Sequence, residues 1–134
     1  MMKIRMMAAI AALLCCAAGS AWADTYPSRP LKLIVGYPAG GASDVAARII
    51  GQKIAERIGQ AVVIENRPGS AGNIGADAVA KAVPDGYTLL LGTISLSVNP
   101  SLYPKMSYDP LKDLAAISMI SSTPFLLVVN PKAP

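Results

Sequence analysis

The chain has 134 residues, of which 53% are hydrophobic and 15% charged, a composition that favours a folded domain over a disordered tail. Its formal net charge is +4, and no basic cluster is interleaved with aromatic residues, so we expect no nucleic-acid partner. The sequence contains no histidine, and its two cysteines, Cys15 and Cys16, both lie near the start. The remainder of the chain therefore cannot build the usual zinc site, a Ser-His-Asp triad or a thiol nucleophile. We expect no metal, no cofactor and no catalytic residue.

Residues 1–23 have the pattern of an export signal. Basic Lys3 and Arg5 precede an apolar run over 6–18, which is too short to cross a bilayer of roughly 30 Å. Ala21-Trp22-Ala23 then places small residues at both positions that signal peptidase recognises. A lipoprotein signal at Cys16 is the rival interpretation, but the small residues expected just before a lipidated cysteine are missing. We expect cleavage after Ala23 and export to the periplasm.

Residues 24–134 alternate predicted strands and helices. Apolar, β-branched runs predict strands at 31–35, 61–64 and 87–91. Because helices are expected between these strands, the strands should run parallel in one sheet.

Two helices are expected between the strands. The first should begin at a capping Ser43 or Asp44 and end at Gly59. The second should start near 71–74 and run to Val83, before Pro84. Five apolar residues at helical spacing should form the buried face of the first helix: Val45, Ile49, Ile50, Ile54 and Ile58.

Beyond Gly92 the pattern is less regular. Asn99-Pro100 is a turn signal, and 109–113 is expected to form a short helical turn. Further strands are expected at 117–120 and 125–129. Because the sequence stops soon after the last of these, we expect a truncated chain.

Two loops should meet at the carboxyl edge of the sheet, where ligands bind in open parallel sheets. The loop over 36–44 is rich in glycine and leads into a helix N-terminus, which together favour an anion. The loop over 92–100 carries short hydroxyl donors at Thr93, Ser95 and Ser97. The alternative for both loops is ordinary turn chemistry with no ligand, and this alternative is stronger for Ser97 than for Thr93.

Three details limit these interpretations. The third glycine-rich loop, 68–75, lacks the Gly-Lys-Ser/Thr ending of a P-loop and does not match the dinucleotide fingerprint, so its glycines favour close packing. Asp44 has no obvious carboxylate partner for acid catalysis, so helix capping or a hydrogen bond to a ligand fits it better. A side chain at Gly41 should obstruct a ligand or forbid the required backbone angles, so Gly41→Val in the full-length protein should weaken binding by about tenfold or more.

Several motifs in a fixed order resemble Bug-type (TctC-like) proteins, the substrate-binding proteins of tripartite tricarboxylate transporters. The resemblance begins with Tyr26-Pro27-Ser28-Arg29-Pro30 and extends over nearly the whole of 24–134. Its other motifs are Pro38-Ala39-Gly40-Gly41-Ala42-Ser43-Asp44, Val63-Ile64-Glu65-Asn66-Arg67-Pro68-Gly69, Gly72-Asn73-Ile74-Gly75, Pro84-Asp85-Gly86-Tyr87-Thr88-Leu89 and Asn99-Pro100-Ser101-Leu102-Tyr103.

This resemblance implies an α/β fold of the type II periplasmic binding protein class, with a mostly parallel sheet flanked by helices. Residues 24–134 would be the incomplete first lobe of a two-lobed protein, with the second lobe missing. The implied ligand is a small di- or tricarboxylate or acidic amino acid, held partly through ordered waters and passed to membrane transporter subunits. By motif, the implied ligand-binding residues are Tyr37, Ala39, Gly40, Gly41, Ser43, Asp44, Thr93 and Ser95.

A secreted α/β hydrolase is the rival hypothesis. It would use Ser43 or Ser95 as its nucleophile, yet the chain has no histidine to act as the base. Neither serine lies in a Gly-x-Ser-x-Gly elbow. Binding without turnover is therefore the expected function.

Overall fold

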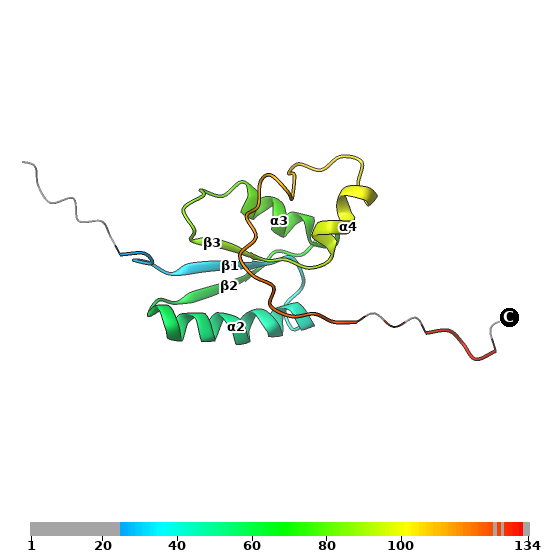
Figure 1. The fold of residues 1–134 in the computed structure, drawn as a ribbon, viewed down its shortest axis with the longest axis horizontal. Coiled ribbons are helices and arrows are strands. Elements are labelled where there is room, and N and C mark those ends of the chain that lie inside the picture. Colours follow the sequence, from blue (N-terminus) through cyan, green and yellow to red (C-terminus); the bar gives the residue numbers. More distant parts are fainter. Residues whose placement is uncertain (1–24, 125, 127, 133–134) are drawn as a thin grey trace, which may run out of the picture.

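The computed structural model describes residues 25–124, 126 and 128–132, and these contain a three-stranded parallel sheet with helices on both faces (Figure 1). The strands are β1 (Leu31–Val35), β2 (Val62–Asn66) and β3 (Thr88–Leu91), in the spatial order β2-β1-β3. The predicted parallel sheet and all three predicted strands are confirmed; the bounds of β1 are as predicted, and those of β2 and β3 differ by one or two residues. The expected signal segment, 1–23, lies outside the described residues.

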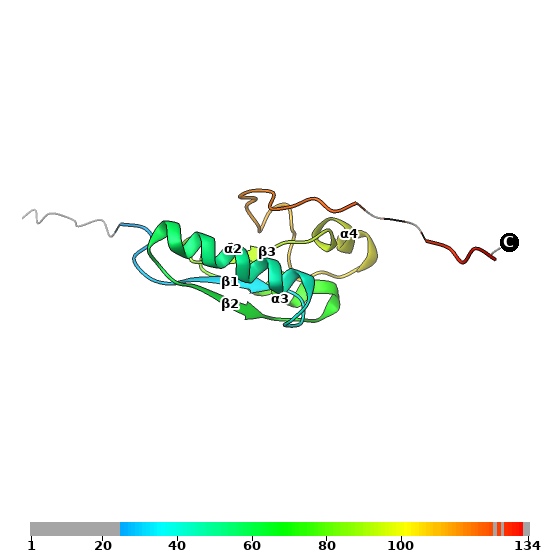
Figure 2. The ribbon, with the colours of Figure 1, turned by 90° about the horizontal axis from the view of Figure 1, so that it is seen from below.

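Helices α2 (Ala42–Ile58) and α3 (Asn73–Ala80) lie on opposite faces of this sheet. Figure 2 shows α2 passing across the sheet on the side away from α3. Such a three-layer arrangement buries the central strand on both faces, which explains why β1 is a nearly continuous apolar run. Its residues Ile34 and Val35 have 1% and 0% of their surfaces exposed.

Helix α2 confirms the first predicted helix, but its predicted apolar face is only partly buried, with Ile50, Ile54 and Ile58 half-buried. Its N-cap is Gly41, without a side-chain cap, so neither Ser43 nor Asp44 caps it as expected. Gly59 ends it in the left-handed conformation as expected. The buried positions are Asp44, Ala47 and Gly51, whereas Val45 and Ile49, expected to be buried, are exposed. Small residues, Ala47 and Gly51, are buried against the sheet because the helix backbone lies close to it. A Cβ at position 51 would lie 3.0 Å from Ile64 Cδ1.

The region after β3 departs most from the sequence prediction. Helix α4 (Ser95–Leu102) was not expected, and it contains the supposed turn at Asn99-Pro100. Asn99 is buried and donates hydrogen bonds to Ala71 O and Asn73 Oδ1, which anchors this two-turn helix despite the proline. The predicted helical turn at 109–113 is confirmed, since Asp113 N–H donates to Asp109 O over 2.8 Å. The second predicted helix is shorter than expected, and a 3-10 turn, η1 (Ser70–Gly72), precedes it.

The strand expected at 117–120 is wrong, because this stretch forms neither strand nor helix. A strand needs a hydrogen-bonding neighbour, and Ile117 and Met119 are instead 81% and 82% exposed. The strand expected at 125–129 falls partly outside the described residues, and the described part of it forms no strand either. Among the residues described, no helix is long and apolar enough to span a membrane.

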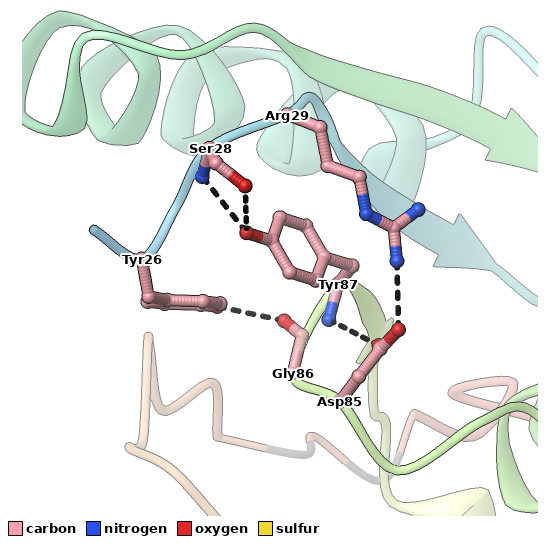
Figure 3. A network of polar contacts seen from close by, with 6 residues as sticks. All are labelled: Tyr26, Ser28, Arg29, Asp85, Gly86 and Tyr87. Atoms are coloured by element: carbon pink, nitrogen blue, oxygen red, sulfur yellow. Dashed lines mark hydrogen bonds and ion pairs between the residues drawn. The ribbon is translucent and has the colours of Figure 1, made fainter. Parts of the chain in front are cut away.

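At the amino edge of the sheet, the segment before β1 is fastened to the turn before β3 (Figure 3). Arg29 Nη2 donates to Asp85 Oδ2 over 2.7 Å, and Ser28 N–H donates to Tyr87 OH over 2.8 Å. We call this set of contacts the amino-edge clasp; it consists of Tyr26, Ser28, Arg29, Asp85, Gly86 and Tyr87.

Candidate functional site

Three predicted site residues meet at the carboxyl edge of the sheet. Tyr37, just after β1, places its hydroxyl 3.0 Å from Thr93 Oγ1 and 3.0 Å from Ser95 Oγ. The two smaller hydroxyls lie 2.7 Å from one another. The parallel register of β1 and β3 brings these loops together, because it places the ends of both strands at the same level. We call these three half-buried groups the hydroxyl triangle.

Counting hydrogens shows what the hydroxyl triangle can offer. Three hydroxyls carry three hydrogens, and a closed ring of three contacts uses all of them. A carboxylate accepts hydrogen bonds only, so one hydroxyl must turn its hydrogen outward and give up a contact within the triangle. That exchange costs about one hydrogen bond, roughly 0.5–1.5 kcal/mol, which a charge-assisted bond to the anion can offset. Tyr37 is the best donor of the three because a phenol is more acidic than an aliphatic alcohol.

The third glycine-rich loop forms a wall of the same site, which the sequence interpretation missed. A Cβ on Gly36 would lie 2.8 Å from Gly72 Cα, and one on Gly75 would lie 2.9 Å from Gly36 Cα. The close packing expected of these glycines is therefore between backbones. A Cβ at position 72 would lie 3.5 Å from both the Tyr37 ring and Ser95 Oγ, so this loop borders the hydroxyl triangle. The spacing Gly72-Asn73-Ile74-Gly75 was the available signal, since both glycines face Gly36 from one end of α3.

A small hollow lies between these loops, with a volume of about 10 Å³. That is close to the least space that holds one water molecule. Its lining includes Gly36, Tyr37, Gly72, Ala76, Thr93 and Ser95.

The rest of the predicted loop lies along the N-terminus of α2. Ala39, Gly40 and Gly41 are exposed, and Ser43 is half-buried. Gly40 has a φ of +82° and so needs glycine, whereas Gly41 has a φ of −78°, which any residue adopts. The expectation that backbone angles require glycine at 41 is therefore wrong, and only the argument from obstruction remains for that position.

Asp44 is buried, with 3% of its surface exposed. Its Oδ2 accepts hydrogen bonds from Arg48 Nε at 2.9 Å and from Gly40 N–H at 2.8 Å. Its Oδ1 accepts one from Asn66 Nδ2 at 3.0 Å. The Arg48 hydrogen bond first, and then the Gly40 N–H, lower the pKa of Asp44 to about 2, against the opposing effect of desolvation. Both carboxylate oxygens are thus engaged inside the protein.

Asn66 was not singled out by the sequence, although it stands in a motif quoted above. It is the last residue of β2, and its Nδ2 also donates to Tyr37 O over 3.1 Å. The amide thus joins the end of β2 to the loop after β1.

The geometry of the described residues gives no support to a metal site or to a hydrolase that uses Ser95 as its nucleophile. Within the described ranges, no group of three or more histidine, cysteine or acidic residues could hold a metal ion. The Ser95 hydroxyl contacts the hydroxyls of Tyr37 and Thr93, and neither contact supplies the histidine that usually activates a serine nucleophile.

Comparison with known proteins decides the family. Residues 46–134 match the profile of the tripartite tricarboxylate transporter family receptor, TctC. The chain belongs to this family. It is also similar to Protein BugT of Bordetella pertussis, with 49% identity over 112 residues, covering 82% of this chain and 34% of BugT.

Solved structures of TctC relatives agree with the fold. The periplasmic binding protein BugD is 41% identical with a TM-score of 0.64, over 66% of this chain and 29% of BugD. MatC from Rhodopseudomonas palustris, solved with bound malate, is 41% identical with a TM-score of 0.58, over 66% of this chain and 30% of MatC. The chain thus spans about a third of the length of these relatives. Its fold is that of part of a periplasmic binding protein, and its family consists of solute-binding receptors.

Proposed function

We propose that this protein binds a small di- or tricarboxylate or acidic amino acid in the periplasm for a tripartite tricarboxylate-type uptake system. The observation that carries the proposal is the hydroxyl triangle, which joins the two carboxyl-edge loops through neutral donors. Neutral hydroxyls can hold an anion without cancelling its charge, so they suit a receptor that must also release its ligand.

In this proposal one ligand carboxylate lies between the two loops. The hydroxyl triangle of Tyr37, Thr93 and Ser95 donates one hydrogen bond from one side, with Tyr37 as the best donor. The glycine-rich turn over 39–41, followed by Ser43, offers backbone and hydroxyl donors from the other side. The hollow of about 10 Å³ supports a contact made partly through one ordered water. The bound malate of MatC supports a carboxylate as the ligand class.

The wider setting is also part of the proposal. Residues 1–23 would direct export and be removed after Ala23, leaving 24–134 in the first lobe of a two-lobed fold. A second lobe would hold the far end of the ligand, and membrane transporter subunits would receive it. Sequencing the N-terminus of the exported protein tests the first step, since Asp24 is the expected first residue. A retained Met1 or a lipid-modified Cys16 would contradict it.

The proposal also predicts binding without turnover, which the receptor family and the hydroxyl-only contacts that Ser95 makes within the described part of the chain support. Calorimetric titration of the full-length protein against L-malate, adipate, citrate and L-glutamate is the decisive experiment. We expect stoichiometric binding of at least one acid, recovered chemically unchanged. No heat of binding with any acid would overturn the carboxylate assignment, and release of a hydrolysis product from a matching ester would favour an enzyme.

A further inference from the structure

The loop between β1 and α2 is held at two backbone points by side chains of two different elements. At one point, Tyr37 O accepts a hydrogen bond from Asn66 Nδ2 at 3.1 Å. At the other, Gly40 N–H donates to Asp44 Oδ2 over 2.8 Å. These points lie on either side of Pro38 and Ala39, so the conformation of the exposed turn is fixed from both ends.

The two holding side chains are also bonded to one another. Asn66 Nδ2 carries two hydrogens, one directed to Tyr37 O and the other to Asp44 Oδ1 at 3.0 Å. Arg48 Nε completes the set by donating to Asp44 Oδ2. Because a carboxylate only accepts and an amide nitrogen only donates, the direction of each bond is fixed. Among the described residues, no buried side-chain nitrogen or oxygen lacks a partner.

We infer that Asn66 and Asp44 are positioning residues, which hold the loop over 37–40 in its binding conformation without touching the ligand. The inference rests on the proposed function in one respect, that this loop meets the carboxylate. Its consequence extends to the hydroxyl triangle, because the backbone that Asn66 fixes carries the Tyr37 side chain. The loop after β1 and the loop after β3 are thereby set relative to one another before a ligand arrives, which lowers the ordering cost of binding.

Charge and burial argue against direct contact between Asp44 and an acid. Asp44 as a whole is 3% exposed, and both of its carboxylate oxygens already accept hydrogen bonds. A negative side chain would also repel a ligand carboxylate. The Arg48 guanidinium, whose Nε lies 2.9 Å from Asp44 Oδ2, offsets this repulsion, so Asp44 can hold the loop near a bound anion.

Asn66→Asp in the full-length protein is the sharpest test, because it keeps the shape and replaces the two donor hydrogens with lone pairs. Facing Tyr37 O and Asp44 Oδ1, those lone pairs should release the loop. We expect L-malate and adipate to bind at least tenfold more weakly, with the protein still folded at the temperature of measurement. Glu65→Gln is the matched control: it is also isosteric, changes the charge by one unit and lies next along β2. It should leave affinity within about twofold.

Amide hydrogen exchange of the ligand-free protein gives a readout that is independent of any ligand. Gly40 N–H should exchange at least tenfold faster in Asn66→Asp, while the amides within β1 keep their protection. A loss of stability alone would instead accelerate both regions together. Should the aspartate prevent folding, Asn66→Ala removes the same donors without adding charge and is expected to give both results in weaker form.

The outcomes separate the inference from the function it rests on. Unchanged Gly40 exchange, or faster exchange with unchanged affinity, would overturn the positioning role. A changed preference among acids in Asp44→Asn, with Asn66→Ala binding normally, would overturn it too, since that result indicates direct contact. Failure of the wild-type protein to bind any acid would contradict the proposed function, while Gly40 exchange would still decide whether Asn66 and Asp44 hold the loop.

Discussion

Strands β1 and β3 are joined at both edges of the sheet, but by different chemistry. At the carboxyl edge, three half-buried neutral hydroxyls meet around a hollow. At the amino edge, the clasp combines an ion pair, a tyrosine pair with ring centroids 5.0 Å apart and a guanidinium 4.1 Å from the centroid of the Tyr87 ring (Figure 3).

The two edges differ in what is lost when a donor leaves its partner within the protein and turns to a ligand. In the clasp, Tyr26 OH donates to a backbone carbonyl, and Arg29 Nη2 donates to a carboxylate. If either side chain turned to a ligand, the protein would lose a hydrogen bond to a backbone carbonyl or an ion pair. In the hydroxyl triangle, any of the three groups can turn outward and leave two contacts intact. The clasp is therefore suited to holding the chain together, and the triangle to binding.

The largest expected effect comes from forcing apart the backbones that form one wall of the binding edge. Gly36→Ala would place a Cβ 2.8 Å from Gly72 Cα and 2.9 Å from Gly72 O. We expect it to lower the free energy of unfolding by roughly 1–3 kcal/mol, as overpacking typically does. Urea denaturation measures this change, with Gly41→Ala as the control. The nearest atom to a Cβ at 41 is Pro38 O at 3.4 Å, so an equal loss in the control would contradict the packing argument.

A second test removes one phenolic hydroxyl from each edge. Tyr37→Phe should weaken carboxylate binding about tenfold, or about 1.4 kcal/mol, because it removes the best donor of the triangle. Tyr26→Phe removes the bond to Gly86 O and should instead lower stability by about 0.5–1.5 kcal/mol.

Calorimetric titration and thermal unfolding of both variants reveal whether the two edges have separate roles. Tyr26→Phe should leave affinity within about twofold. If it weakened binding as much as Tyr37→Phe does, the conclusion that the clasp stabilises the chain while the hydroxyl triangle binds the ligand would be wrong.

The same comparison shows what the sequence could predict. Apolar runs bounded by glycine and proline were enough to predict the strands of the sheet. The signal is clear because β1 is buried on both faces, where few residues other than apolar ones are tolerated. Parallel order then brought Tyr37 to Thr93 and Ser95 without further information. The motif resemblance could not indicate which edge of the sheet binds a ligand, because its motifs include both the clasp residues and the residues of the loop after β1.

Other features depend on contacts distant in the sequence and were missed. Asn66 looked like the end of a strand, and only its position opposite Tyr37 O and Asp44 reveals its role. Helix α4 was hidden by Asn99-Pro100, because the partners that bury Asn99 come from residues 71–73. The apolar face of α2 was assigned by counting hydrophobic residues, whereas close approach to the sheet selected Ala47 and Gly51.

Acid should loosen the loop anchored by Asp44. Its pKa in the folded protein is about 2, below the ordinary value of 3.8, mainly because Arg48 donates to the charged form. A carboxyl group whose pKa is lower in the folded state stabilises above the unfolded value, and this contribution disappears as pH falls from about 4 towards 2. Urea denaturation at stepped pH should therefore show wild type and Asp44→Asn converging over that window. A constant difference between them would mean that Asp44 does not ionise as described.

The smallest expected effect lies in the ion pair of the clasp. Arg29 and Asp85 approach to 2.7 Å, but their side chains are 59% and 33% exposed, so solvent screens their attraction. Asp85→Asn retains an oxygen that can accept from Tyr87 N–H and removes only the charge. We expect a loss of about 0.2–1 kcal/mol in low salt, shrinking towards zero in about 1 M NaCl, where the Debye length falls to about 3 Å. Thermal unfolding at both salt concentrations measures the change, and ligand affinity should stay constant. A loss that persists in high salt would contradict the conclusion that solvent screens this ion pair.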